Sequence, residues 1–211
     1  MFGVNDGLVS NVALILGMAG ANVAGTSVRL AGLAGLVGGA FSMAVGEYVS
    51  MQAQSELMQR ELDIERHAIR HHPDDERQEL VALYQARGIE AGLAEELSAE
   101  VMRDPEMALE THAREELGIN PGQLGNPYQA AASSFVMFAI GALIPLVPWF
   151  VARGTVATLW SVGLGASAAL AVGAGLSFFT GRAWWRSAVR QLLVSAVAAG
   201  VTYAIGHLFR H

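Results

Sequence analysis

The sequence contains no cysteine, no lysine and no acidic residue after Glu116. The missing cysteine excludes disulfide bonds and thiolate metal sites, so metal ligands must be oxygen, imidazole or thioether groups. All 13 basic residues are arginine, which together with abundant alanine and glycine indicates a GC-rich, bacterial genome. The first residues lack the basic segment of a secretory signal, and Asp6 interrupts their apolar run.

Charge is scarce and unevenly distributed. Charged residues make up 15% of the chain and hydrophobic residues 53%, whereas soluble domains carry about a quarter charged residues. Of the 19 acids, 17 lie between Glu56 and Glu116 with seven arginines, giving that stretch a net charge of −10. The rest of the chain holds two acids and six arginines. This partition indicates one region in a membrane and another in water.

Five apolar segments are long enough to cross a bilayer core, which takes roughly 20 helical residues. They cover about 4–24, 30–53, 130–152, 155–178 and 188–208. The first is the weakest because polar residues dilute it, and Pro145 and Pro148 should bend the end of the third. Gly35 and Gly39 form a GxxxG pair, and the fourth segment is also rich in glycine, which favours close helix packing in lipid.

The polar stretch between the second and third spans predicts further helices. The second span has no stop signal and should continue as a polar helix to about His71. A helix should begin after Pro73 and stop at Gly88, and a short one follows it. Asp104, followed by a proline, is a good N-cap for a last helix that ends at Gly118. A linker rich in glycine and proline then leads to the third span.

The predicted fold class is an all-α membrane protein with five transmembrane helices. Residues 1–55 carry spans 1 and 2, residues 56–118 form an acidic cytoplasmic insert, and residues 119–211 hold the linker and spans 3–5. If the insert is cytoplasmic, arginines number ten inside and three outside, as the positive-inside rule requires. Outside the insert the two sides are equal, with inner Arg182, Arg186 and Arg190 and outer Arg29, Arg153 and Arg210. We therefore expect a multi-pass protein of a bacterial inner membrane.

Asp6 and Glu47 are the only acids in the predicted spans. An ionisable group at that depth is costly and by default marks a transport path. The alternatives are a helix cap for Asp6 and an arginine partner from another span for Glu47. Met43, Glu47 and Met51 recur at i, i+4 and i+8 on one helix face. Thioethers with a carboxylate suit Fe²⁺-like ions better than Mg²⁺ or Ca²⁺, although methionine stripes are also common in packing.

The insert contains pairs of metal-ligating residues at helical spacing. They are Glu61 and Glu65, His67 and His71, Glu76 and Glu79, and His112 and Glu116. Carboxylate with imidazole is a ligand set for Fe²⁺, Mn²⁺, Co²⁺ or Zn²⁺. A solvated charged face is the alternative for any single acid, but the net charge of the whole insert attracts cations.

Motifs for other chemistry are missing. No Glu-x-x-His occurs, so the ferritin-type di-iron helix motif is absent. No P-loop or Gly-x-Ser-x-Gly elbow occurs either, which argues against an ATP-driven pump and a hydrolase. No basic patch indicates nucleic acid binding. We therefore expect a non-enzymatic protein without a tightly bound cofactor.

Several segments resemble those of one known family. They are residues 3–10 (GVNDGLVS), 42–50 (SMAVGEYVS), 112–118 (HAREELG), 126–131 (NPYQAA) and 141–145 (GALIP). In this order and spacing, they resemble the vacuolar iron transporter family, which includes nodulin-21-like proteins. The resemblance covers most of the chain, and the paired NDG and GEYVS segments make it specific.

The resemblance implies a five-span homodimer with a cytoplasmic helical metal-binding domain and an ion path at the dimer interface. It implies exchange of Fe²⁺, and often Mn²⁺, for protons. By position, Asp6, Met43 and Glu47 resemble the residues of the ion path. The residues that resemble ligands in the insert are Glu65, Glu76, Glu79 and Glu116.

The chain also departs from the family pattern. An insert acid usual in the family falls at Ala68 here, and His67 or His71 is our candidate substitute. His112 stands where some members have methionine. Family members also usually carry a short amphipathic segment before the first span, where this chain begins almost at once.

The sequence thus predicts a proton-coupled exporter of Fe²⁺ and related ions from the cytoplasm. Its insert would bind metal through Glu65, Glu76, Glu79, His112 and Glu116, with Glu61, His67 and His71 as additional ligands. Its partners would be lipid, divalent ions, protons and a second copy, not nucleic acid. The alternative is a non-transporting membrane protein that senses or stores metal or docks a partner. A membrane di-iron oxidase is a third class, and the missing Glu-x-x-His weighs against it.

Overall fold

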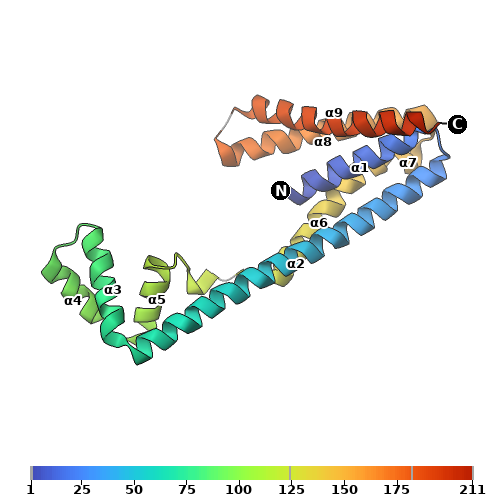
Figure 1. The fold of residues 1–211 in the computed structure, drawn as a ribbon. Helices are drawn as coiled ribbons and strands as arrows, with labels where there is room; N and C mark the ends of the chain where they lie inside the picture. Colours follow the sequence, from blue (N-terminus) through green and yellow to red (C-terminus); the bar gives the residue numbers. More distant parts are fainter. Residues whose placement is uncertain (1, 124, 182, 211) are drawn as a thin grey trace. The chain divides into compact units, whose positions relative to one another are not determined.

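A computed structural model describes residues 2–123, 125–181 and 183–210. Within these ranges the regular elements are all helical (Figure 1). The helices are α1 (Phe2–Gly20), α2 (Gly25–His71), α3 (Pro73–Ala86), α4 (Ala91–Val101), α5 (Pro105–Glu115), α6 (Pro127–Leu146), α7 (Pro148–Val151), α8 (Gly154–Thr180) and α9 (Trp184–Leu208), with a 3-10 turn at Pro121–Gln123.

The chain divides into two compact units. Unit 1 comprises Met1–Tyr48 and Tyr128–His211, and unit 2 comprises Val49–Pro127. The division falls within α2, which continues without a break to His71, as the missing stop signal predicts. In the described part of the chain, α2, α6, α8 and α9 are long and apolar enough to cross a membrane. The protein is therefore a multi-pass membrane protein, and a fifth span through α1 remains a prediction.

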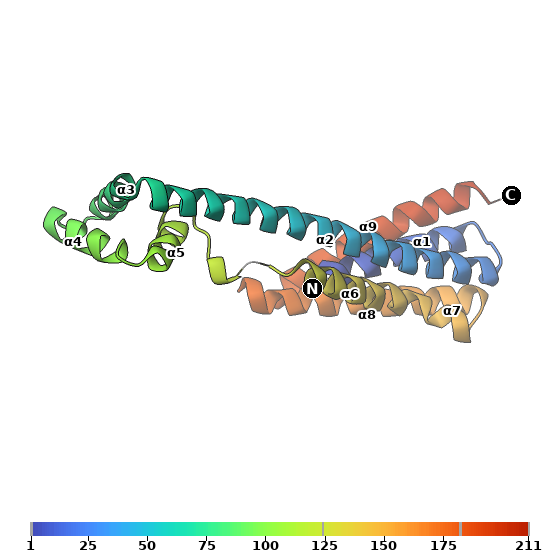
Figure 2. The same ribbon diagram turned by 90° about the horizontal axis from the view of Figure 1, so that it is seen from below.

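Close backbone contacts pack the helices of unit 1. α1 lies against α9 and α8, and α8 lies against α9 (Figures 1 and 2). A Cβ atom at Gly7 or Gly141 would collide with the facing backbone of α6 or α1, and one at Gly206 would collide with Gly17 of α1. Glycine is therefore required at these crossings. The predicted GxxxG pair makes side-chain contacts instead, with Gly35 near Asn11 and Gly39 against the Phe138 ring.

The expected third span is interrupted near its end. α6 contains Pro145 and ends at Leu146, and the short α7 then begins at Pro148. Two carbonyl groups at this interruption accept hydrogen bonds from other helices. Asn11 Nδ2 donates to the Ala142 oxygen at 2.6 Å, and Ser161 Oγ donates to the Pro145 oxygen at 2.7 Å. These hydrogen bonds link α1 and α8 to the proline-containing end of α6.

In unit 2, α5 packs against the second half of α2. Their shared core includes Leu62 and Ile69 of α2 and Leu109 and Ala113 of α5. α3 begins at Pro73 and is followed by Gly88 at φ +89°, which confirms the predicted start and stop. α5 has Asp104 as its N-cap, with Oδ1 accepting from the Glu106 N–H at 2.9 Å, which confirms the predicted cap.

Candidate metal centre

The packing of α5 on α2 positions the centre of unit 2. Leu62 and Ile69 flank Glu65 on α2, and Leu109 and Ala113 flank His112 on α5. Because these apolar side chains meet in one core, Glu65 and His112 are brought close to each other. The imidazole is fully buried, with 0% exposure, and Glu65 is 8% exposed.

Three carboxylates surround the His112 imidazole. Its Nδ1 atom lies 3.1 Å from Glu65 Oε1, 3.7 Å from Glu76 Oε2 and 3.5 Å from Glu116 Oε2. Glu76 comes from the first turn of α3 and is 8% exposed, whereas Glu116 is the more exposed C-cap of α5. Three helices therefore contribute to one cluster.

Several buried polar atoms of this cluster lack hydrogen-bond partners. They are Glu65 Oε1, Glu76 Oε2 and His112 Nε2. Glu65 Oε1 is close to the imidazole, yet the two groups are not oriented for a hydrogen bond. Buried polar groups are normally paired, so two unpaired carboxylate oxygens beside the same imidazole require an explanation. A bound cation is the explanation that fits the two unpaired oxygens, which lie on the Nδ1 side of the imidazole, whereas Nε2 points away from that side and would not bind the same ion.

Electrostatic repulsion in the cluster changes how its acids titrate. Burial raises the pKa of Glu65 to about 7, and the negative charges of Glu76 and Glu116 add to that rise. Burial also raises the pKa of Glu79, an exposed acid one turn after Glu76. A divalent cation would remove this repulsion, since an opposite charge nearby favours the ionised carboxylates.

The geometry suits a small divalent transition metal. One ligand atom each from Glu65, His112 and Glu116 lies within 4.8 Å of the others. Metal–ligand bonds of about 2.0–2.2 Å to nitrogen and oxygen could be reached from such a spacing by small side-chain movements. Carboxylates with one imidazole suit Fe²⁺, Mn²⁺, Co²⁺ or Zn²⁺.

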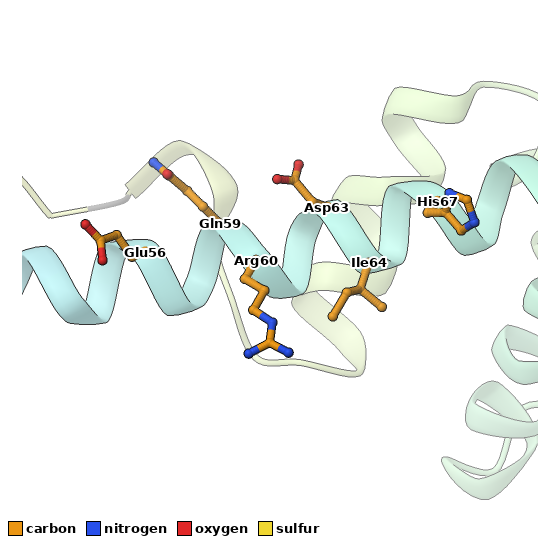
Figure 3. Close-up of a pocket in the computed structure, with 6 residues that line it drawn as sticks. All are labelled: Glu56, Gln59, Arg60, Asp63, Ile64 and His67. Carbon is orange, nitrogen blue, oxygen red and sulfur yellow. The ribbon is translucent and has the colours of Figure 1, made fainter.

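The remaining insert residues predicted as ligands lie outside this cluster. Glu61 is half-buried on α2, one turn before Glu65. His67 and His71 are exposed, and their rings stack at 3.9 Å between centroids. His67 belongs to an open hollow of about 500 Å³, to which one face of α2 contributes all the lining residues, Glu56, Gln59, Arg60, Asp63, Ile64 and His67 (Figure 3). The structure thus brings His112, rather than His67 or His71, to the buried carboxylates.

The two membrane acids lie on different helices of unit 1. Asp6 is exposed on α1, and its carbonyl accepts a hydrogen bond from Ser10 Oγ. Glu47 is half-buried on α2, one turn after Met43, which packs against the core of Ala40, Phe138 and Ala142. Within the described ranges neither carboxylate makes an ion pair, so no arginine partner for Glu47 is found there. Arg182 lies outside the described residues.

One polar contact beside Asp6 was missed from the sequence. Gln191 of α9 donates a hydrogen bond to Asn5 Oδ1, and both side chains are half-buried. The sequence indicates Asn5 as one of the polar residues that dilute the first span and as part of the GVNDGLVS segment. A polar side chain repeated on two apolar helices was the available signal, but the pairing depends on how α1 packs on α9.

Comparisons with known proteins show the family of the chain. Residues 1–207 match the VIT family. The chain is 36% identical to a vacuolar iron transporter of Acanthamoeba castellanii, covering 99% of this chain and 76% of that protein. It is 32% identical to vacuolar iron transporter 1 of Oryza sativa subsp. japonica, covering 97% and 82%. These eukaryotic relatives give no support to the bacterial inner membrane expected from composition. The chain belongs to the VIT family.

Proposed function

We propose that this chain exports Fe²⁺ from the cytoplasm in exchange for protons, with Mn²⁺ and similar divalent ions as further cargo. The buried cluster of His112, Glu65 and Glu76 carries the proposal, because unpaired oxygens of both carboxylates lie beside the His112 Nδ1 atom, an arrangement that fits a divalent cation. Iron is supported as cargo because the relatives are named vacuolar iron transporters.

The insert collects the metal on the cytoplasmic side. Its net charge of −10 concentrates cations near the cluster. Glu79 and Glu61 supply carboxylates at the margin of the cluster. His67 and His71 form a separate outer position, in which the His71 Nδ1 atom lies 2.8 Å from the His67 carbonyl oxygen. If Nδ1 donates this bond, His71 Nε2 is left free to bind a metal.

Asp6, Met43 and Glu47 line the path through the membrane. Metal binding requires ionised carboxylates, so Asp6 and Glu47 alternate between a proton and the ion. Met43 adds a soft ligand that favours Fe²⁺-like ions over Mg²⁺ and Ca²⁺. Since the sequence has no nucleotide-binding motif, an ion gradient supplies the energy, about 1.4 kcal/mol per proton for each pH unit.

The transporter is a homodimer. One chain offers only two membrane carboxylates, a thin ligand set for one ion. A twofold axis presents the same residues twice and doubles this set. Phe41, Val45 and Val49 of α2 are exposed large apolar side chains available to a second copy.

A cysteine introduced at Ala44, in a chain with no other cysteine, should crosslink two copies. A monomeric mass in several mild detergents with no crosslink would contradict the dimer.

Transport in proteoliposomes tests the function. With an imposed pH gradient, the reconstituted protein should move Fe²⁺ or Mn²⁺ and release the gradient in proportion to the metal moved. A metal sensor or store, the competing function, should bind the metal yet leave the lumenal concentration and the pH gradient unchanged. That result would favour the non-transporting alternative.

A further inference from the structure

Two adjoining hollows lie in unit 1 at the end where α2 begins. They have volumes of about 290 and 270 Å³ and share Gly25, Trp149 and Gly154 as lining residues. Helices α1 and α9 end here, and α8 begins here. Because α2, α8 and α9 are all candidate membrane spans, this end lies at the level of lipid headgroups and water.

Three arginines line the hollows without an acidic partner. Arg29 and Arg153 line one hollow, and Arg210 lines the other. In the part of the chain that the structure describes, none of the three makes an ion pair. The nearest acid on α2 is Glu47, 18 residues from Arg29 and so about 27 Å along the helix. The other acid of unit 1, Asp6, lies near the opposite end of α1. Among the described residues of unit 1, no acidic side chain therefore compensates the positive charge here.

The start of α8 adds unpaired N–H groups to the same place. Arg153 is its N-cap and provides no side-chain hydrogen bond to the first turn of this 27-residue helix. The first four N–H groups of a helix have no partner within it and carry the positive end of the helix dipole. Gly154 lines both hollows with φ +56°, a conformation that glycine adopts without strain. Such a helix start binds anions readily.

A buried indole provides an independent observation. Trp149 lines both hollows and is 5% exposed, yet its Nε1–H has no hydrogen-bond partner. A buried donor without an acceptor is unusual and points to a missing ligand. The hollows are lined by three arginines, a buried indole donor and neutral polar side chains, and no acid is among the described lining residues.

We propose that this end of unit 1 binds a phosphate group, held by Arg29, Arg153, the first N–H groups of α8 and Trp149. A phosphate has several acceptor oxygens, and arginine binds it with two parallel hydrogen bonds. The group can belong to an anionic phospholipid headgroup or to free phosphate, and the position at the ends of three spans favours the lipid. The site is separate from the metal centre of unit 2 and does not depend on transport.

The unfolding midpoint of the purified protein in detergent tests the site. It should be followed during titration with phosphatidylglycerol, with diacylglycerol of the same chains, and with inorganic phosphate. Phosphatidylglycerol should raise the midpoint saturably, and diacylglycerol should not. A response to inorganic phosphate as well would assign the site to the free anion, and both patterns support a phosphate site. Equal responses to phosphatidylglycerol and diacylglycerol would overturn it.

Three variants locate the effect. Arg29→Gln with Arg153→Gln should weaken the apparent affinity by at least about tenfold for each arginine. Trp149→Phe replaces the indole by a smaller aromatic ring without an N–H and should weaken the affinity about threefold. The control is Arg70→Gln with Arg103→Gln, which removes the same charge from exposed positions of unit 2 and should leave the affinity unchanged. Wild-type affinity in the Arg29 and Arg153 double variant would overturn the proposal even if the indole variant did not fold.

Discussion

At the scale of single residues, the insert contains four histidines, but only one is buried among carboxylates. His112 is fully buried and has Glu65 Oε1 at 3.1 Å, whereas His67 and His71 are exposed. His112→Ala should therefore weaken Mn²⁺ or Zn²⁺ binding by at least about tenfold, because it removes a ligand and leaves the carboxylates repelling one another. Calorimetric titration of the whole protein in detergent measures this change.

The matched control is His67→Ala with His71→Ala. These changes remove two imidazoles from the same segment, so they should reduce the number of bound ions or leave it unchanged, while the tightest affinity stays. Loss of the tightest binding in this control, with His112→Ala unaffected, would place the main site on the exposed face of α2.

The raised pKa of Glu65 predicts a pH-dependent metal affinity. Its pKa of about 7 means that a proton occupies the carboxyl below neutral pH. The metal must displace this proton, so Mn²⁺ affinity should fall by up to about tenfold per pH unit below pH 7 and level off above it. Titrations at several pH values measure the slope. Glu65→Gln should bind Mn²⁺ more weakly, and its affinity should depend much less on pH. An unchanged slope of affinity against pH would assign the proton to another group.

The same shift affects stability without metal. A folded-state pKa above the unfolded value of 4.5 means that the folded insert binds the proton more tightly than the unfolded chain does. This contribution is fully present below pH 4.5 and is lost as pH rises towards 7, by up to about 3 kcal/mol. Metal should therefore raise the free energy of unfolding more at pH 8 than at pH 5. Equal effects at both would contradict the assignment.

At the scale of helices, unit 1 depends on a few close crossings. A Cβ atom at Gly206 of α9 would collide with the Gly17 carbonyl group of α1, whereas one at Gly200 would meet nothing within 4 Å. Gly206→Ala should therefore destabilise the protein by about 1–3 kcal/mol, the usual cost of overpacking. Gly200→Ala, in the same helix, should be neutral or slightly stabilising. Unfolding midpoints in detergent compare them, and equal midpoints would refute this packing.

Local signals in the sequence were enough to predict most helices. Asp104 with a following proline starts α5, and Gly88 ends α3 because each acts on its own turn. The prolines indicated a bend between α6 and α7, whereas the hydrogen bonds that Asn11 and Ser161 donate there depend on how other helices pack. The close glycine crossings were missed for the same reason: a sequence does not show which glycine faces another backbone.

For the candidate site too, local spacing predicts which residues share a helix face, but not which of them are buried together. Helical spacing marked His67 with His71 and His112 with Glu116 equally, because each pair is i, i+4. Only the packing of α5 on α2 distinguishes them, since it buries His112 beside Glu65. Residue chemistry therefore predicts candidate ligands, and tertiary packing brings only some of these candidates together.

At the scale of the whole molecule, the two units divide the work of the proposed transporter. Unit 2 carries most of the acids and the metal cluster, and unit 1 carries Asp6 and Glu47. Binding and transport should therefore be separable by mutation. A change in unit 1 should stop transport without affecting binding in unit 2, whereas a change such as His112→Ala should slow transport mainly at low metal concentration, where collection limits the rate.

Glu47→Gln is the decisive change. Glu47 is half-buried within α2, where the backbone N–H groups are already used by the helix, and it has no ion-pair partner in the described part of the chain. A carboxylate at such a position is costly unless it serves a path for ions. Glutamine keeps the shape and removes the charge, so assembly and metal binding by the insert should persist. Metal flux into proteoliposomes should fall to background, and metal-driven proton movement should vanish with it.

Met43→Ala is the companion variant for the path. It removes a soft ligand one turn before Glu47 and leaves the carboxylate, so flux should fall only in part and selectivity should shift away from softer ions. Flux of Fe²⁺ and Mn²⁺ measured side by side gives this ratio. The two variants separate charge from ligand softness: the first should abolish transport of every ion, and the second should change which ion is preferred. If Glu47→Gln moved metal at the wild-type rate, Glu47 would be a structural acid, and the path would have to run elsewhere.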